Sequence, residues 1–195
     1  HVAFDKAGHY FGVIVRRVPV DRLTRKVQIR AMERAINANT VLLVGSAPNF
    51  PDGMIDDIVS IGALAKRHKI GCHVDCCLGS FLMPFLEPAG FVSEPFDFRV
   101  DGVTSISCDT HKYGFAPKGS WIVIYHTEAL RRYQYYVSTD WVGGVYASPT
   151  LAGSRAGALI AGAWAAMTSL GRDGYIQSCG EFVGGALEIE SRCGG

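Results

Sequence analysis

The sequence has no excess of charge of either sign. Of its 195 residues, 19 are Lys or Arg and 18 are Asp or Glu, which leaves a net charge of +1. Proteins that bind nucleic acid usually carry a basic excess on one face, so this balance argues against a nucleic-acid partner. Charged residues make up only 19% of the chain and hydrophobic residues 48%, which argues against a disordered chain.

Long hydrophobic runs are also missing. The uncharged stretch richest in Ala and Gly covers 156–171, and its 16 residues fall short of the ~17–25 that a membrane-spanning helix needs. We interpret this stretch as a helix buried in a protein core. The N-terminus has no signal-peptide pattern and begins with His1 rather than Met, so we expect the chain to be a fragment of a longer protein.

Cysteine is present, but not in the pattern of a disulfide-rich secreted domain. Three of the six cysteines lie within six residues, beside a predicted buried strand, so we expect a reducing compartment. The same cluster is a poor candidate for a metal site. Side chains alternate along a strand, so Cys72 and Cys76 are expected on one face and His73, Asp75 and Cys77 on the other.

Apolar runs and helical apolar spacing alternate along the chain. Glycine is abundant, at 23 residues of 195 against a usual ~7%, which suits the tight turns of α/β enzymes. A strand or an extended stretch is expected at 10–15, and strands at 40–45, 70–75, 103–108 and 121–125. Helices are expected at 27–38, 55–68, 128–135, 151–170 and 175–190. This order predicts an α/β fold, a three-layer α/β/α arrangement with a mostly parallel sheet, and a single structural unit.

Polar residues follow three of the predicted strands, at the edge of the sheet where α/β proteins bind ligands. They are Ser46, Asp75 and the segment 109–112, which ends in Lys112. Taken singly, Asp75 suits a turn or a helix cap, and Lys112 suits a solvated turn. Together they are the two groups that pyridoxal phosphate requires, a lysine that forms a Schiff base and an aspartate that pairs with the pyridine nitrogen.

Several motifs carry a resemblance to a known family. The segments 1–7 (HVAFDKA), 73–79 (HVDCCLG) and 109–114 (DTHKYG) resemble fold-type-I pyridoxal-phosphate enzymes of the group II decarboxylase branch. Within that branch, longer segments are similar to the sphingosine-1-phosphate lyase family. These are 96–107 (FDFRVDGVTSIS), 114–119 (GFAPKG), 139–150 (TDWVGGVYASPT) and 152–157 (AGSRAG), so the resemblance extends over nearly the whole chain.

The resemblance implies roles for individual residues. Lys112 is implied as the Schiff-base lysine, Asp75 as the partner of the ring nitrogen, and Lys118 as a catalytic residue that contacts the substrate phosphate, although alone it would be a plain turn lysine. Five residues are implied around the cofactor: His1 stacked on the ring, Cys77 on the opposite ring face, His111 near the phosphate, Ser154 at the phosphate of the partner subunit, and Ser46 near the ring hydroxyl.

One histidine is left open by the motifs. His73 shares a strand face with Asp75, so it either supports that carboxylate or is simply a buried, hydrogen-bonded histidine. The second interpretation is the plainer one.

The resemblance also implies an activity and a setting. It implies a lyase, dependent on pyridoxal 5'-phosphate, that cleaves the C2–C3 bond of a phosphorylated long-chain base to a long-chain aldehyde and phosphoethanolamine. It implies a homodimer, held at the endoplasmic reticulum membrane with its catalytic domain in the cytosol by a segment that this sequence does not contain. Residues 1–195 are then expected to be part of the large cofactor-binding domain, without its glycine-rich phosphate loop and without the small C-terminal domain.

Two alternatives stay open at this point. An amino-acid decarboxylase would use the same Lys112, Asp75 and His1, but Lys118 and the segments within 139–157 favour the lyase. An inactive fragment that acts only as a binding domain is the other alternative, and the intact pair of Asp75 and Lys112 argues against it.

Overall fold

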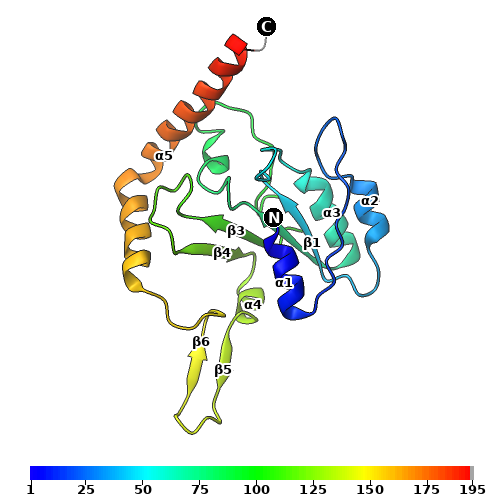
Figure 1. Ribbon diagram of the computed structural model, residues 1–195, viewed down its shortest axis with the longest axis vertical. Helices are drawn as coiled ribbons and strands as arrows, with labels where there is room; N and C mark the ends of the chain where they lie inside the picture. Colours follow the sequence, from blue (N-terminus) through cyan, green and yellow to red (C-terminus); the bar gives the residue numbers. More distant parts are fainter. Residues whose placement is uncertain (194–195) are drawn as a thin grey trace.

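The computed structural model describes residues 1–193 and is built around a four-stranded sheet (Figure 1). The strands are β1 (Leu42–Ser46), β2 (Gly71–Asp75), β3 (Ser105–Asp109) and β4 (Trp121–Tyr125), in that spatial order. The first three strands are parallel, and β4 runs antiparallel to β3. In register, Ser46 lies opposite Asp75, which lies opposite Ser107. The carboxyl ends of β1, β2 and β3 therefore meet at one edge.

The helices α2 (Ile29–Ala35) and α3 (Ile58–His68) lie together on one side of the sheet. The side chain of Asp57 begins α3 by accepting a hydrogen bond from the Ser60 N–H at 2.9 Å, as expected of a helix cap. The apolar face of α3 packs on the residues of β2 whose side chains point toward it. This core contains the fully buried residues Ile61, Cys72, Val74 and Cys76 among others.

The opposite face of the sheet carries polar side chains and is approached by α1 (Ala3–Phe11). The ring of Phe4 meets the ring of His73 edge to face, with 5.9 Å between their centroids. Helices therefore lie on both faces of the sheet. The predicted α/β fold with a mostly parallel sheet is confirmed.

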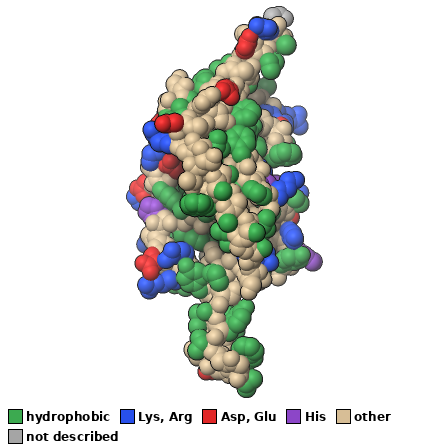
Figure 2. All heavy atoms as spheres, turned by 90° about the vertical axis from the view of Figure 1, so that its left-hand side faces the viewer, with side chains coloured by type: hydrophobic (Ala, Val, Ile, Leu, Met, Phe, Trp, Pro, Cys, Tyr) green, Lys and Arg blue, Asp and Glu red, His purple; other side chains and the backbone are tan. Residues whose placement is uncertain are grey.

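The C-terminal part extends away from the sheet. After η1 (Met83–Phe85) and α4 (Glu128–Arg132), the strands β5 (Tyr136–Ser138) and β6 (Tyr146–Ser148) form a protruding hairpin. The long helix α5 (Gly157–Cys193) follows and is kinked at Gly171, whose φ of 61° and ψ of −174° are not helical. Figure 2 shows hydrophobic side chains on the surface of both parts; Val142 of the hairpin and Trp164 of α5 are exposed.

Some element predictions require correction. A strand or an extended stretch was expected at 10–15, and the strand is wrong: residues 10 and 11 end α1, and residues 13–15 pair with no strand in the described part of the chain. A short apolar run alone does not separate a strand from a helix end, and here Gly12 ends the helix in the left-handed region, with φ at 66°. The helices expected at 27–38 and 128–135 are shorter than predicted.

The C-terminal region also differs in detail from the prediction. Helices were expected at 151–170 and 175–190. In the structure a single helix, α5, begins at Gly157 and is kinked at Gly171, which lies between the two expected helices. The β5–β6 hairpin was not predicted. Over residues 1–193, none of the helices has the length and apolar character required to span a membrane.

Candidate active site

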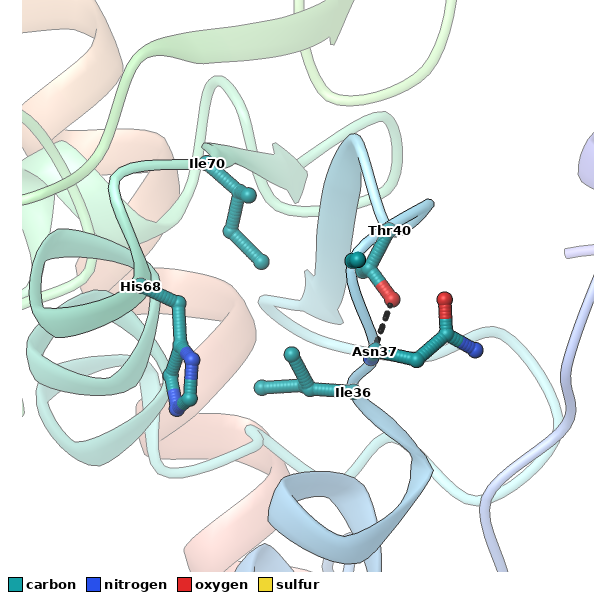
Figure 3. A pocket seen from close by; sticks show the side chains of 6 residues that line it. Ile36, Asn37, Thr40, His68 and Ile70 are labelled. Carbon is teal, nitrogen blue, oxygen red and sulfur yellow. Dashed lines mark hydrogen bonds between the residues drawn. The ribbon is translucent and has the colours of Figure 1, made fainter.

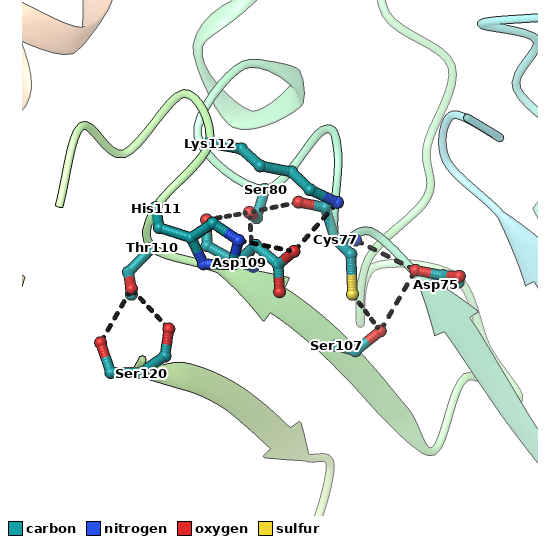
Figure 4. Close-up of polar contacts among 9 residues, drawn as sticks. All are labelled: Asp75, Cys77, Ser80, Ser107, Asp109, Thr110, His111, Lys112 and Ser120. Atoms are coloured by element: carbon teal, nitrogen blue, oxygen red, sulfur yellow. Dashed lines mark hydrogen bonds and ion pairs between the residues drawn. The ribbon is translucent and has the colours of Figure 1, made fainter. Parts of the chain in front are cut away.

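Asp75 ends β2 and is nearly buried, with 9% of its surface exposed. Its Oδ1 accepts hydrogen bonds from the Cys77 N–H at 3.2 Å and from the Ser107 hydroxyl at 3.4 Å (Figure 4). Both of the hydrogen bonds found for this side chain within residues 1–193 end on Oδ1. The other oxygen, Oδ2, is left for a ligand.

Lys112 lies in the loop that follows β3, and its side chain extends toward the end of β2 (Figure 4). Its Nζ lies 2.9 Å from Oδ2 of Asp109, and Nε2 of His111 lies 3.8 Å from the same oxygen. Asp109 is held in turn by Ser80, whose Oγ accepts the Asp109 N–H at 3.1 Å and donates to the Asp109 carbonyl at 3.2 Å. The ion pair thus positions the lysine amine over the carboxyl edge of the sheet.

The loop that carries Lys112 is fixed from two sides. Within it, the Ala116 N–H donates to the Thr110 carbonyl at 3.0 Å. From α5, the hydroxyl of the buried Tyr175 donates to the Gly114 carbonyl at 2.9 Å. Burial raises the pKa of Tyr175, so this hydroxyl keeps its proton and remains a donor.

His111 contributes an unused polar atom to this site. Its Nδ1 is buried, and it has no hydrogen-bond partner among the residues that the structure describes. A buried polar nitrogen without a partner is costly, and a bound polar group would remove that cost. The atom therefore marks a place where a ligand with polar oxygens fits.

Cys77 is the second residue after β2, and it contacts both Asp75 and Ser107 of β3. Its thiol donates to the Ser107 Oγ at 3.3 Å. Burial raises the pKa of the Cys77 thiol to about 12, so it is a neutral, small side chain at neutral pH. Cys76 next to it belongs to the apolar core on the other face, as the alternation along the strand predicted.

The remaining predicted site residues are less closely tied to this cluster. His1 is exposed and its Nδ1 accepts the Ala3 N–H at 3.1 Å; it lies one turn before Phe4, which contacts His73 beside Asp75. Ser46 is the register neighbour of Asp75 on β1. Lys118 and Ser154 are exposed.

The structure therefore brings some of these residues together and leaves others apart. In the described part of the chain, no hydrogen bond or ion pair joins Lys118 or Ser154 to the cluster at the ends of β2 and β3. Asp109, Ser80 and Ser107 belong to that cluster but were given no role from the sequence. Asp109 had a usable signal, because it stands three residues before Lys112 in the same motif.

The other candidate sites have less support from the structure. A cavity of about 350 Å³ is lined by Ile36, Asn37, Thr40, His68 and Ile70, among others (Figure 3). Thr40 and Ile70 precede β1 and β2, so this cavity lies at the amino ends of the strands, opposite to Asp75. Within residues 1–193, no three His, Cys, Asp or Glu side chains are gathered in the manner of a metal site.

Comparison with known proteins identifies close relatives. The sphingosine-1-phosphate lyase of Saccharomyces cerevisiae is 55% identical over 191 residues, which are 97% of this chain and 32% of that protein. The enzyme of the same name from Drosophila melanogaster is 56% identical over 190 residues, 97% of this chain and 35% of that protein. The chain therefore spans about a third of the length of these curated relatives.

Solved structures of related enzymes are similar to this chain. The sphingosine-1-phosphate lyase of Burkholderia pseudomallei superposes with a TM-score of 0.88 at 50% identity, over 91% of this chain and 40% of that one. The glutamate decarboxylase of Lactobacillus brevis superposes with a TM-score of 0.77 at 24% identity, over 91% of this chain and 41% of that one, and shows a shared fold.

The side chains gathered at the sheet edge have the chemistry that pyridoxal 5'-phosphate, the cofactor of such enzymes, requires. Lys112 offers an amine, the Oδ2 of Asp75 offers a partner for a ring nitrogen, and the Nδ1 of His111 offers a buried polar atom. The family model of the pyridoxal-dependent decarboxylase conserved domain matches residues 1–193. By this match over nearly its full length, the chain belongs to the pyridoxal-dependent decarboxylase family.

Proposed function

We propose that the protein is a carbon–carbon lyase that cleaves the C2–C3 bond of a phosphorylated long-chain base, giving a long-chain aldehyde and phosphoethanolamine. The observation that carries this proposal is the 50–56% identity to sphingosine-1-phosphate lyases of yeast, fly and a bacterium. The position of Asp75 and Lys112 at one sheet edge also supports it, because these side chains supply the carboxylate and the amine that the cofactor requires.

Lys112 and Asp75 have the central roles in this proposal. When bound, pyridoxal phosphate supplies an electrophilic carbon for an amine and a ring that accepts the electron pair of the bond that breaks. Lys112 holds the cofactor through its amine, which Asp109 orients at 2.9 Å. Asp75 pairs with the ring nitrogen through Oδ2 and keeps the proton on that nitrogen, which maintains the electron demand of the ring.

The surrounding residues hold the cofactor and the substrate. His1 would stack on one face of the cofactor ring and the neutral Cys77 thiol would pack on the other. The buried Nδ1 of His111 would bond the cofactor phosphate. Lys118, exposed on the turn after the Lys112 loop, supplies a positive charge for the substrate phosphate. Ser46 lies beside Asp75 in register and would meet the ring hydroxyl.

The assembly and the location belong to the same proposal. Residues 1–195 form part of the large cofactor-binding domain of a homodimer, in which Ser154 reaches the cofactor phosphate of the partner subunit. The exposed position of Ser154, away from the cluster around Lys112, supports this role. The enzyme acts at the endoplasmic reticulum membrane with its catalytic domain in the cytosol, and the membrane contact is made by a segment outside this sequence.

A product assay tests the proposed reaction. The full-length protein, supplied with pyridoxal phosphate, is incubated with a phosphorylated long-chain base and, separately, with the same base lacking its phosphate. We expect a long-chain aldehyde from the phosphorylated base alone. Release of CO2 from an amino acid, with no aldehyde from either base, would show a decarboxylase instead.

Two matched variants separate substrate recognition from general charge effects. Lys118→Gln is expected to raise the KM for the phosphorylated base, because the charge facing the phosphate is lost. Lys69→Gln removes the same charge from an exposed position at the end of α3 and is expected to leave KM unchanged. Equal KM values for the two variants would contradict the role of Lys118.

A further inference from the structure

A continuous chain of hydrogen bonds runs along the polar face of the sheet toward Asp75. It begins at the Ser105 Oγ, which lies 2.8 Å from Nδ1 of His73. Nε2 of His73 lies 3.1 Å from the Ser107 Oγ, which in turn lies 3.4 Å from Oδ1 of Asp75. Every polar atom of the imidazole therefore has a partner, and both partners come from β3.

The surroundings of the imidazole favour its neutral form. His73 is largely covered, and the ring of Phe4 lies edge to face against it at 5.9 Å. Burial lowers the pKa of His73, and the nearby charge of Asp75 acts in the opposite direction with a smaller effect. A neutral imidazole carries a proton on only one nitrogen and accepts on the other.

The direction of the hydrogen bonds follows from the carboxylate at the end of the chain. An ionised carboxylate only accepts, so the single proton of the Ser107 hydroxyl is donated to Asp75. The Ser107 oxygen can then act only as an acceptor toward His73, which requires the proton on Nε2. Nδ1 is left as an acceptor and takes the proton of the Ser105 hydroxyl. All three donors then point toward Asp75.

The reverse order is less favourable. If Nδ1 carried the proton, the Ser107 hydroxyl would have to donate to Nε2, and Asp75 would lose that donor. The Cys77 thiol, which lies 3.3 Å from the Ser107 oxygen, is a weak donor and replaces a hydroxyl poorly. A hydrogen bond to a charged acceptor is worth about twice a neutral one, so the order that ends on the carboxylate is favoured.

We propose that His73 is a positioning residue: as the Nε2–H tautomer it fixes the Ser107 hydroxyl toward Oδ1 of Asp75 and so holds the orientation of the carboxylate, with Oδ2 turned to the cofactor. This inference rests on the proposed function, since it concerns how Asp75 meets the ring nitrogen. It also changes the interpretation of His73 made from the sequence, where a buried, hydrogen-bonded histidine without such a role was the plainer one.

Two amide variants of similar shape test the assignment in the full-length protein. His73→Gln places an amide nitrogen near the position of Nε2 and can still donate to Ser107. His73→Asn carries its amide near the position of Nδ1 and cannot reach Ser107. We expect the dissociation constant for pyridoxal phosphate, measured by absorbance titration, to rise roughly 10-fold or more in His73→Asn, as for loss of a hydrogen bond that supports a charged group. His73→Gln should stay within about 3-fold of wild type, since it keeps that bond.

A second measurement does not depend on the cofactor. Nitrogen NMR of histidine-labelled protein without cofactor, with the His73 signals identified by their loss in His73→Gln, reports which ring nitrogen carries the proton. We expect the proton on Nε2 and a lone pair on Nδ1. Ser107→Ala should shift the Nε2 signal and weaken cofactor binding to the same extent as His73→Asn.

The outcomes separate this inference from the proposed function. A proton on Nδ1, or equal cofactor affinity in His73→Asn, His73→Gln and wild type, would overturn the role of His73 while leaving the lyase proposal intact. Failure of the wild-type protein to bind pyridoxal phosphate would instead overturn the proposed function, and the role of His73 toward the cofactor would fall with it.

Discussion

The hydrogen bond from Tyr175 to the Lys112 loop can be tested by removing a single oxygen atom. The Tyr175 hydroxyl donates to the Gly114 carbonyl at 2.9 Å, and its ring lies against Phe81 and Phe85 with centroids 5.1 and 5.3 Å away. Tyr175→Phe keeps the ring and its packing but removes the donor. We expect the variant to fold, with a loop around Lys112 that opens more often.

The size of the effect follows from the burial of the bond. Tyr175 is 4% exposed, so water does not readily replace the lost donor. Removing one partner of a buried hydrogen bond costs about 1–2 kcal/mol. If that energy is lost from the closed state of the loop alone, the open state becomes roughly 5- to 30-fold more populated.

Hydrogen exchange measured by mass spectrometry reads this population directly. The peptide that covers residues 110–116 contains the Phe115 and Ala116 amides, which bond the carbonyls of Lys112 and Thr110. These amides are expected to exchange about 5- to 30-fold faster in Tyr175→Phe. Tyr133→Phe, at a position 89% exposed, is the matched control and should exchange like wild type. Equal exchange in both variants would refute the argument.

Three further changes test other parts of the site. Asp75→Asn is expected to lower turnover by a factor on the order of 10² to 10³, in steady-state assays, while borohydride still modifies the lysine; near-normal turnover would contradict its role. Gly114→Ala places a Cβ 2.4 Å from a backbone oxygen, whereas at Gly157 nothing lies within 4 Å. The first alanine should therefore lower the free energy of unfolding by about 1–3 kcal/mol and the second should not, as measured by urea denaturation. Burial lowers the pKa of His73 in the folded protein, whereas in the unfolded chain this histidine takes up a proton near its ordinary pKa of ~6.5. The free energy of unfolding therefore falls as the pH drops through that value. The urea midpoint of His73→Gln should fall less between pH 7.5 and 5.5, and equal falls would argue against this cause.

The sheet could be predicted from the sequence because β1 and β4 lie in continuous apolar runs and apolar residues alternate with polar ones in β2 and β3. The residues 121–125 form β4 as expected, and β1, β2 and β3 begin within two residues of their predicted starts. The β5–β6 hairpin was missed because it is exposed on both faces, as at Tyr136 and Val137. Without a buried face, a strand has no alternation for the sequence to reveal.

The site could be predicted only in part. Asp75 and Lys112 stand in recognisable motifs, and the structure places both at the carboxyl edge of the sheet. The hydrogen bonds of His73 join it to residues 32 and 34 positions away. That link depends on the register of β2 against β3, which the sequence does not specify. The contact between Tyr175 and Gly114, 61 positions apart, depends on tertiary packing in the same way.

The identity of the lysine that holds the cofactor is the central claim, and one experiment tests it directly. The full-length protein is saturated with pyridoxal phosphate, reduced with borohydride, digested and mapped by mass spectrometry. The account predicts one pyridoxyl group, on the peptide that contains Lys112, and no such group in Lys112→Ala. A pyridoxyl group on another lysine, or none in folded protein, would contradict the account.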